Sequence, residues 1–280
     1  MIASRFFRAI VTVGCVAALA GCASKPPLPK RASIDHLPQP AADTDFNAVV
    51  AGADIIYFPA ERAASGARSE PSALILDALR QSGAPFAIAW DLIDAGEQPL
   101  LDELPGKAER ERDQLIARLD LVGTGRTREY CRAVLRDERL AGVRHLAVRA
   151  PAPLVATIRA GTLPPDEERR ISGGFIPPDG GLELYAERIA GTRGASQGDL
   201  AGAYRAQVIG QQFAAGQIID HFRGAGAGGK LLVFLRREDL VAGQGVPHYV
   251  VQKTDLRQVI LASDVAQEER RKLLTGTAAL

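Results

Sequence analysis

The sequence predicts an α/β fold: a mainly parallel central sheet flanked by helices, with a helix-rich insertion. Short apolar runs typical of strands alternate along the chain with longer segments of helical periodicity. The strand-like runs are continuously apolar rather than alternating, as expected for parallel strands that are covered on both faces. This alternation predicts one sheet domain of the α/β class.

The clearest unit in the chain is a strand, a helix and a second strand. Residues 54–58 and 86–90 are the two apolar runs, and between them a helix is expected to begin at Pro71 and to end at Ser82-Gly83. This spacing suits a parallel crossover connection. Further strands are expected at 145–148, 231–235, 249–251 and 259–261.

The stretch between the second and fourth of these strands is rich in helix signals. The longest predicted helix spans about 199–222, where Tyr204, Gln211 and Phe222 share one face at steps of three and four. Proline and glycine pairs predict loops at 164–165, 173–174 and 177–178. The other helices are expected at 109–119, 127–141, 152–160 and 181–190.

The first 21 residues have the pattern of a bacterial lipoprotein signal peptide. Arg5 and Arg8 precede an apolar run over residues 9–19, which is too short to span a bilayer, and Leu-Ala-Gly-Cys follows at 19–22. Small residues before the cleavage point suit a signal peptidase, and the thiol of Cys22 is the group that accepts lipid. The mature protein is therefore expected to be tethered to a membrane through Cys22.

The segments after the signal peptide predict the location and the domain limits. Ala23-Ser24 carries no Asp, which in a Gram-negative cell favours the outer membrane, facing the periplasm. Residues 22–45 are expected to form the lipidated N-terminus and a proline-rich spacer. The α/β domain is expected over 46–265, with its helical insertion at about 100–198, and a polar tail over 266–280.

The composition excludes several classes of protein. Removal of residues 1–21 leaves 32 basic and 33 acidic side chains, so no overall field favours nucleic acid or anionic lipid. A hydrophobic content of 46% is enough for a substantial core. With Cys15 in the signal peptide and Cys22 lipidated, Cys131 has no partner for an intramolecular disulfide.

No motif for metal-dependent or nucleophilic catalysis is present. None of the four histidines, at 36, 145, 221 and 248, pairs with another at metal-ligand spacing. The glycines at 224–229 precede a strand, whereas a phosphate-binding loop opens a helix, and no Gly-x-Ser-x-Gly turn occurs. The sequence therefore predicts a protein that is not an enzyme and has no metal site.

Six sets of residues follow one another in an order that matches a known family. They are 55–58; 86–91 with 98–102; 130–151; 167–169 with 185–188; 204–207 with 211–215; and 243–247. In this order and spacing, the chain from about Asp54 to Pro247 resembles the ChaN-like haem-binding lipoproteins of the Tiki superfamily. The resemblance implies an α/β domain with a helical insertion that binds haem at the outer membrane in iron acquisition.

The motif positions of that family are altered in this chain. The Gly-Glu-x-His implied after the first strand is Pro-Ala-Glu61-Arg62, and the next acid is Asp91 instead of Glu. The last motif falls on 236–239, so that Asp239 occupies the position of its His. Imidazole chemistry cannot operate at these positions. The acids either keep part of a site or form an ion network with Arg62, Arg236 and Arg237.

Two classes of function therefore remain. A haem-binding lipoprotein would need an apolar slot and an axial ligand, for which Tyr57 is the first candidate, followed by Tyr185 and Tyr204, unless these residues simply pack in the core. The alternative is a non-catalytic envelope scaffold or interaction protein that has lost the family site. Residual hydrolysis is the least favoured outcome. The expected partners are a membrane, through the lipid, and haem; nucleic acid is not expected, and a homodimer is left open.

Overall fold

The computed structural model describes residues 33–36, 44–63, 71–189, 197–224, 226–240 and 245–261. The predicted signal peptide, Cys22 and the predicted tail lie outside these residues. Among the described residues, no helix combines the length and the hydropathy needed to cross a bilayer.

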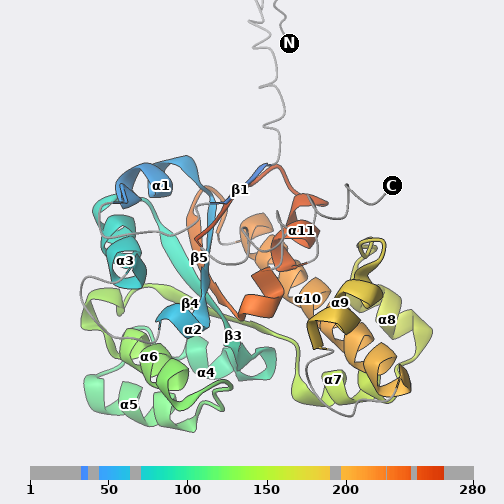
Figure 1. Ribbon diagram of the computed structural model, residues 1–280. Helices are drawn as coiled ribbons and strands as arrows, with labels where there is room; N and C mark the ends of the chain where they lie inside the picture. Colours follow the sequence, from blue (N-terminus) through green and yellow to red (C-terminus); the bar gives the residue numbers. More distant parts are fainter. Residues whose placement is uncertain are drawn as a thin grey trace, which may run out of the picture. The chain divides into compact units, whose positions relative to one another are not determined.

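A parallel sheet forms the centre of the described domain (Figure 1). Its six strands lie in the order β1-β6-β2-β5-β3-β4, and every pair of neighbours is parallel. The α/β fold class is thereby confirmed. The strands are β1 (Ser33–His36), β2 (Ile55–Pro59), β3 (Phe86–Asp94), β4 (Arg144–Arg149), β5 (Lys230–Leu235) and β6 (Arg257–Ile260).

Helices cover both faces of the sheet, which explains the continuous burial of its central strands. Alternate side chains of β2 and β5 enter two separate cores. Ile56 and Phe234 pack towards α1, α3, α5 and α6, whereas Ile55 and Val233 pack towards α10 and α11. The helices are α1 (Phe46–Gly52), α2 (Ala60–Ala63), α3 (Pro71–Gln81), α4 (Gln98–Asp102), α5 (Glu109–Arg118), α6 (Gly125–Arg136), α7 (Ala152–Arg159), α8 (Pro165–Ser172), α9 (Gly181–Ile189), α10 (Gln197–Arg223) and α11 (Val246–Val251), with the 3₁₀ turns η1 (Ala95–Glu97), η2 (Glu138–Leu140) and η3 (Arg237–Leu240).

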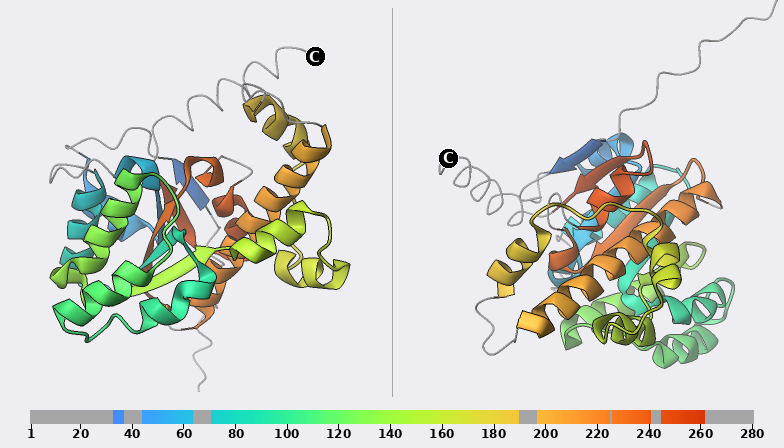
Figure 2. Two further views of the ribbon diagram at one scale, coloured as in Figure 1. Left: turned by 90° about the horizontal axis from the view of Figure 1, so that it is seen from below. Right: turned by 90° about the vertical axis from the view of Figure 1, so that its right-hand side faces the viewer.

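The helices between β4 and β5 make a further layer beyond the sheet. Figure 2 shows α7 and α8 beside the N-terminal half of α10, with α9 near its beginning. A small third core joins α7, α8 and α10. Its buried members are Ile158 of α7, Leu163 of the α7–α8 connection, and Ala206 and Ile209 of α10, with Ile171 of α8 packed against them. Gly202 allows α7 and α10 to approach closely, because a Cβ at that position would lie 2.9 Å from the backbone oxygen of Arg159.

Two side chains tie the edge of the sheet to its connections. The amide of Gln98 pairs with the outer edge of β4, where its Oε1 accepts from the Ala147 N–H at 2.7 Å and its Nε2 donates to the His145 carbonyl at 3.0 Å. The carboxylate of Asp94 accepts from the Gly96 and Ala152 N–H groups, both at 2.8 Å. The hydrogen bond from the Ala152 N–H to Asp94 fixes the start of α7 against the end of β3.

The predicted elements and the observed ones differ at several places: α1, α2 and α4 are additional helices, and α6 ends at Arg136 instead of at residue 141. The strand expected at 249–251 is wrong, because this segment belongs to α11, which has Pro247 in its first turn and Tyr249 fully buried. The loop expected at Pro164-Pro165 is instead the start of α8, with acidic residues in its first turn. Strand β1 was not predicted, since Ser-Ile-Asp-His has no apolar run.

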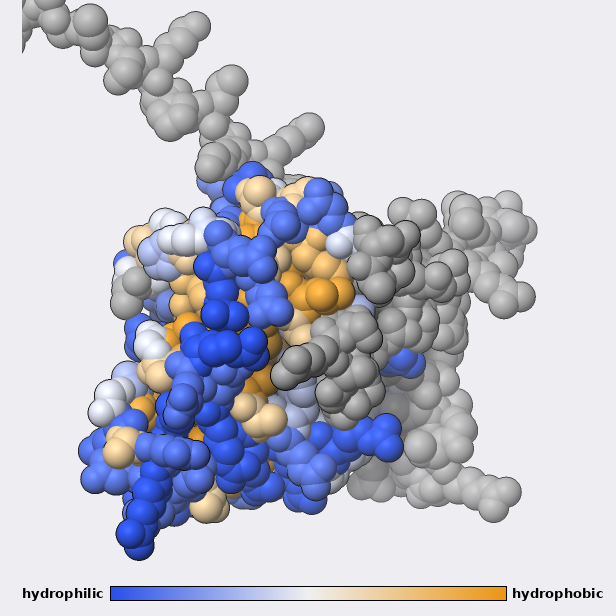
Figure 3. All heavy atoms as spheres, turned by 90° about the vertical axis from the view of Figure 1, so that its left-hand side faces the viewer, coloured by the Kyte–Doolittle hydropathy of each residue, from blue (hydrophilic) through white to orange (hydrophobic). Residues whose placement is uncertain are grey.

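The outer surface over α1, α3 and neighbouring elements is largely polar. On the face drawn in Figure 3, hydrophilic residues form a broad band across the described surface, and apolar residues show beside it. Among the described residues, the large hydrophobic side chains with substantial exposure are Ile176 at 73% and Leu182 at 38%, and both lie in the helical layer around α9.

Candidate functional site

The candidate site lies where β3, β4 and β5 end. Asp91 follows Trp90, the last residue of β3 in regular register with β5, at a point where the pairing of β3 and β4 shifts. Arg149 is the last residue of β4, and Arg236 directly follows β5. Because parallel strands end at one edge of the sheet, these side chains converge there, at the edge where open α/β sheets bind ligands.

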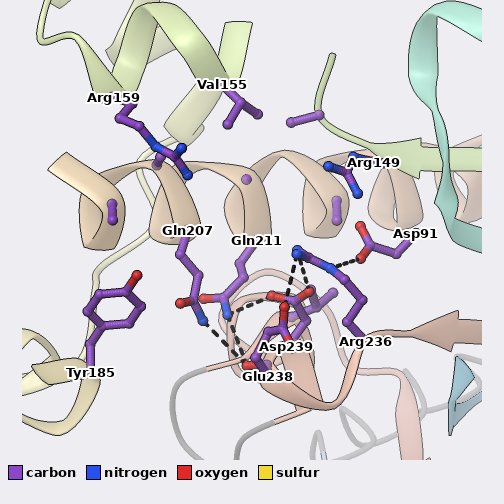
Figure 4. A pocket seen from close by; sticks show the side chains of 16 residues that line it. Asp91, Arg149, Val155, Arg159, Tyr185, Gln207, Gln211, Arg236, Glu238 and Asp239 are labelled. Atoms are coloured by element: carbon purple, nitrogen blue, oxygen red, sulfur yellow. Dashed lines mark hydrogen bonds and ion pairs between the residues drawn. The ribbon is translucent and has the colours of Figure 1, made fainter. Parts of the chain in front are cut away.

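A cavity of about 280 Å³ opens at this edge, and we call it the polar cavity (Figure 4). Its floor is the face of α10 that carries small residues, among them Ala203 and Gly210. Val155 and Arg159 of α7 line one side, and Tyr185 of α9 stands at one end. The remaining polar lining residues are Asp91, Arg149, Gln207, Gln211, Arg236, Glu238 and Asp239.

Arg236 joins the acidic residues of the polar cavity. Its guanidinium reaches Asp91 Oδ2 through Nε at 2.8 Å, Asp239 Oδ2 through Nη2 at 2.8 Å and Glu238 Oε1 through Nη1 at 3.0 Å. The side chains of Asp91 and Asp239 are only 7% and 3% exposed, whereas that of Arg236 is 35% exposed. The ion network expected around Asp91 and Asp239 is thus present, with Arg236 as its shared cation.

The environment of Asp239 shifts its ionisation. Burial raises the pKa of Asp239, Arg236 lowers it and Asp91 raises it, and the net result is a pKa of about 6. Gln211 donates to Asp239 Oδ1 at 3.0 Å and so favours the ionised form. Burial lowers the pKa of Arg236, but the charges of Asp239, Asp91 and Glu238 outweigh it and raise that pKa on balance, so this cation stays charged.

Two further arginines line the polar cavity from its other side. Arg149 ends β4, and Arg159 ends α7. Within the described ranges neither side chain makes a hydrogen bond or an ion pair. Sequence reasoning missed both residues, because nothing in their local pattern separates them from ordinary surface arginines.

Beside the polar cavity lies a more apolar groove of about 470 Å³, which we call the Tyr204 groove. Phe175, Val208 and Ile209 supply apolar walls between α8 and α10, and Arg205 at the margin pairs with Glu168. Tyr204 also lines the groove, and its ring centre is 5.6 Å from that of Tyr185. One tyrosine of this pair therefore lines each hollow, Tyr185 the polar cavity and Tyr204 the groove.

Local geometry sets the position of Tyr204. A Cβ at residue 181 would collide with the Tyr204 hydroxyl, so glycine there allows α9 to approach α10. Burial raises the pKa of Tyr204, and the charge of Glu183 raises it further. The phenol of Tyr204 is accordingly protonated near neutral pH.

The remaining predicted site residues lie away from both hollows. Tyr57, the first haem-ligand candidate, is fully buried in β2, and its hydroxyl donates to Gln258 Oε1 at 2.7 Å. Burial also raises its pKa. This position gives Tyr57 a packing role in the observed conformation. Glu61 lies in α2 with its side chain exposed, and burial of part of it and the charge of Glu238 raise its pKa; α2 also includes Arg62.

The buried histidine His145 has a structural role, and no metal site is seen in the described residues. His145 is buried beside Trp90, whose Nε1–H donates to His145 Nδ1 at 3.1 Å, and burial lowers the pKa of His145 to about 4. Among the described residues, no group of three or more His, Cys, Asp or Glu side chains is arranged to hold a metal ion.

Comparisons with known proteins identify the fold. No protein-family model matches the sequence, and no curated protein matches it. Among solved structures, the chain is similar to one described as cofacial heme binding to ChaN of Campylobacter jejuni, with a TM-score of 0.52 and 15% sequence identity, over 77% of this chain and 83% of that one. The fold is ChaN-like. The predicted resemblance is confirmed at the level of the fold.

The two hollows differ in their fit to haem, which requires an apolar slot and an axial ligand. The polar cavity is smaller than the roughly 300–1,000 Å³ typical of small-molecule pockets, and buried polar groups line it. The Tyr204 groove has the larger volume, the apolar walls and a phenol oxygen. Of the two, the Tyr204 groove is the one whose residues fit haem.

Proposed function

We propose that this protein is a haem-binding lipoprotein of the ChaN-like type that acts in iron acquisition and has no catalytic activity. It is anchored to the outer membrane by lipid on Cys22 and faces the periplasm. Tyr204 is the proposed axial ligand, and Phe175, Val208 and Ile209 would contact the porphyrin faces or edges.

The observation that carries this proposal is the Tyr204 groove in a ChaN-like fold. A tyrosine oxygen can serve as a haem ligand, and apolar walls favour a porphyrin over water. Arg205 and Arg169 line the same groove, where they pair with Glu168 and Asp166. The propionate groups of haem would replace these carboxylates as partners of the two guanidinium groups. The proposal includes no catalytic role because Asp91 and Asp239, at two of the altered motif positions, form ion pairs with Arg236.

A spectroscopic titration tests the proposal. Purified full-length protein is titrated with haemin, and a saturable Soret band distinct from that of free haemin is expected. Tyr204→Phe should weaken binding at least tenfold and change the band, because the phenol oxygen is lost. Tyr185→Phe identifies the neighbouring tyrosine as the ligand if it, and not Tyr204→Phe, has this effect.

Tyr57→Phe is the matched control, because it removes one tyrosine hydroxyl that lies in neither hollow. Its Soret titration should match that of the wild type. Titrations without a saturable band in the wild type would refute haem binding.

The alternative is an envelope scaffold or interaction protein. The observation that favours it is the ion network in which Arg236 pairs with Asp91, Glu238 and Asp239. This network lies at the motif positions that the resemblance implies for the family site. A scaffold should give no saturable haem spectrum, so that the same titration separates the two functions.

A further inference from the structure

The polar cavity has two sides of opposite charge. Arg149 and Arg159 lie along the side formed by the end of β4 and by α7, whereas Glu238 and Asp239 lie across α10 on the side that follows β5 (Figure 4). Asp91 completes the acidic set and is held by Arg236. The small-residue face of α10 separates the two sides.

The cationic side holds positive charge that the described residues do not neutralise. Neither Arg149 nor Arg159 makes an ion pair within the described ranges, although both line the cavity. Arg149 is half-buried, and α7 holds Arg159 at its last residue. Guanidinium groups in this setting are suited to carboxylate or phosphate oxygens.

The acidic side holds negative charge in excess. Three carboxylates, those of Asp91, Glu238 and Asp239, share the single guanidinium of Arg236. The side chains of Asp91 and Asp239 also contact each other through a hydrogen bond. Glu238 uses one carboxylate oxygen for Arg236, and for the other no hydrogen bond or ion pair is seen in the described residues. A cationic group in the cavity would therefore meet excess negative charge on this side.

This arrangement discriminates against ligands of one sign. A plain anion attracted by Arg149 and Arg159 would face the acidic side, and a plain cation attracted by Glu238 would face the two arginines. We propose that the polar cavity binds a zwitterionic small molecule, with its anionic group at Arg149 or Arg159 and its cationic group at Glu238 and Asp239.

The floor of the cavity leaves room for such a molecule. A Cβ at Gly210 would meet no atom within 4 Å, so this part of α10 faces open space. The volume of about 280 Å³ lies just below the range of typical small-molecule pockets, so it limits the ligand to a molecule much smaller than a porphyrin. The proposal is therefore independent of haem binding in the Tyr204 groove.

Three matched probes test the charge requirement. 6-Aminohexanoate carries both charges, hexanoate only the anion and hexylamine only the cation, on the same six-carbon chain. Binding to the full-length protein is measured by calorimetry at pH 7.5 and constant ionic strength. 6-Aminohexanoate is expected to bind at least tenfold more tightly than either single-charge probe. 4-Aminobutyrate and 8-aminooctanoate, measured alongside it, locate the best charge separation.

Variants place the probe in the polar cavity. Arg149→Gln and Arg159→Gln remove the proposed partners of the ligand carboxylate, and at least one of them should weaken 6-aminohexanoate binding tenfold or more. Glu238→Gln removes a proposed partner of the ligand ammonium group and should also weaken binding. Arg126→Gln is the control, because Arg126 is an exposed arginine of α6 outside the cavity. Gly210→Leu fills open space and should abolish binding while the protein stays folded.

Three results would overturn the proposal of a zwitterion site. Equal binding of 6-aminohexanoate and hexanoate would show an anion site only and would overturn the proposal. Absence of binding by all five probes would overturn it as well, as would an undiminished affinity in Gly210→Leu. Since haemin titration is a separate measurement on a separate groove, either site can fail while the other stands.

Discussion

Replacement of Arg236 by glutamine should destabilise the protein by about 3 kcal/mol. The change leaves Asp91 and Asp239 without their shared cation, and their side chains are only 7% and 3% exposed. Loss of one partner of a buried ion pair typically costs about 3–5 kcal/mol. The lower end applies because Arg236 is itself about one-third exposed. For a domain of this size, about 3 kcal/mol corresponds to a fall of roughly 6–12 °C in melting temperature.

The loss should depend on pH in a defined direction. The pKa of Asp239 is about 6 in the folded protein, above its unfolded value of about 3.9, so the folded state binds more protons and stability falls as pH rises between these values. Without Arg236 the folded pKa rises further. The variant should therefore lose less stability, relative to the wild type, at pH 5 than at pH 8.

Urea unfolding of wild type and variant at pH 5 and pH 8 measures both effects. Arg139→Gln is the control, because Arg139 is 61% exposed and pairs with Asp137 at the surface, where a loss below about 1 kcal/mol is expected. If Arg236→Gln lost no more stability than Arg139→Gln, or lost more at pH 5 than at pH 8, the network described here would be wrong.

Three further outcomes are expected. Cys22→Ser should abolish incorporation of labelled palmitate, and unchanged labelling would end the lipoprotein interpretation. Tyr57→Phe should lower the free energy of unfolding by about 1–3 kcal/mol, because Gln258 Oε1 would lose its buried donor; an unchanged urea midpoint would show that this hydrogen bond contributes nothing. Reducing agent should leave the melting temperature unchanged, because Cys131 is buried with a free thiol, and a large drop would reveal an intermolecular bridge.

The core strands could be predicted because burial on both faces leaves a continuous apolar run. Residues 54–58, 86–90 and 231–235 each correspond to a central strand of the sheet. Segment 249–251 has the same composition but lies in a helix, since a run of three apolar residues has no period that separates the two structures. Edge strand β1 is polar and short, and so gave no signal.

The candidate site could be predicted in part. Motif positions that follow strands pointed to Asp91 and Asp239, and the adjacent arginine explained how buried acids could be tolerated. Arg149 reaches the cavity from the end of β4, and Arg159 reaches it through the packing of α7 on α10, which no local pattern encodes. The burial of Tyr57 in β2 could not be predicted from the sequence, because a residue near the end of a central strand can face either of the two cores.

Haemin titration of the full-length protein tests the central claim most directly. We expect a saturable Soret band in the wild type, at least tenfold weaker haemin binding in Tyr204→Phe, and unchanged binding in Tyr57→Phe. A wild-type spectrum identical to that of free haemin at every protein concentration would contradict it.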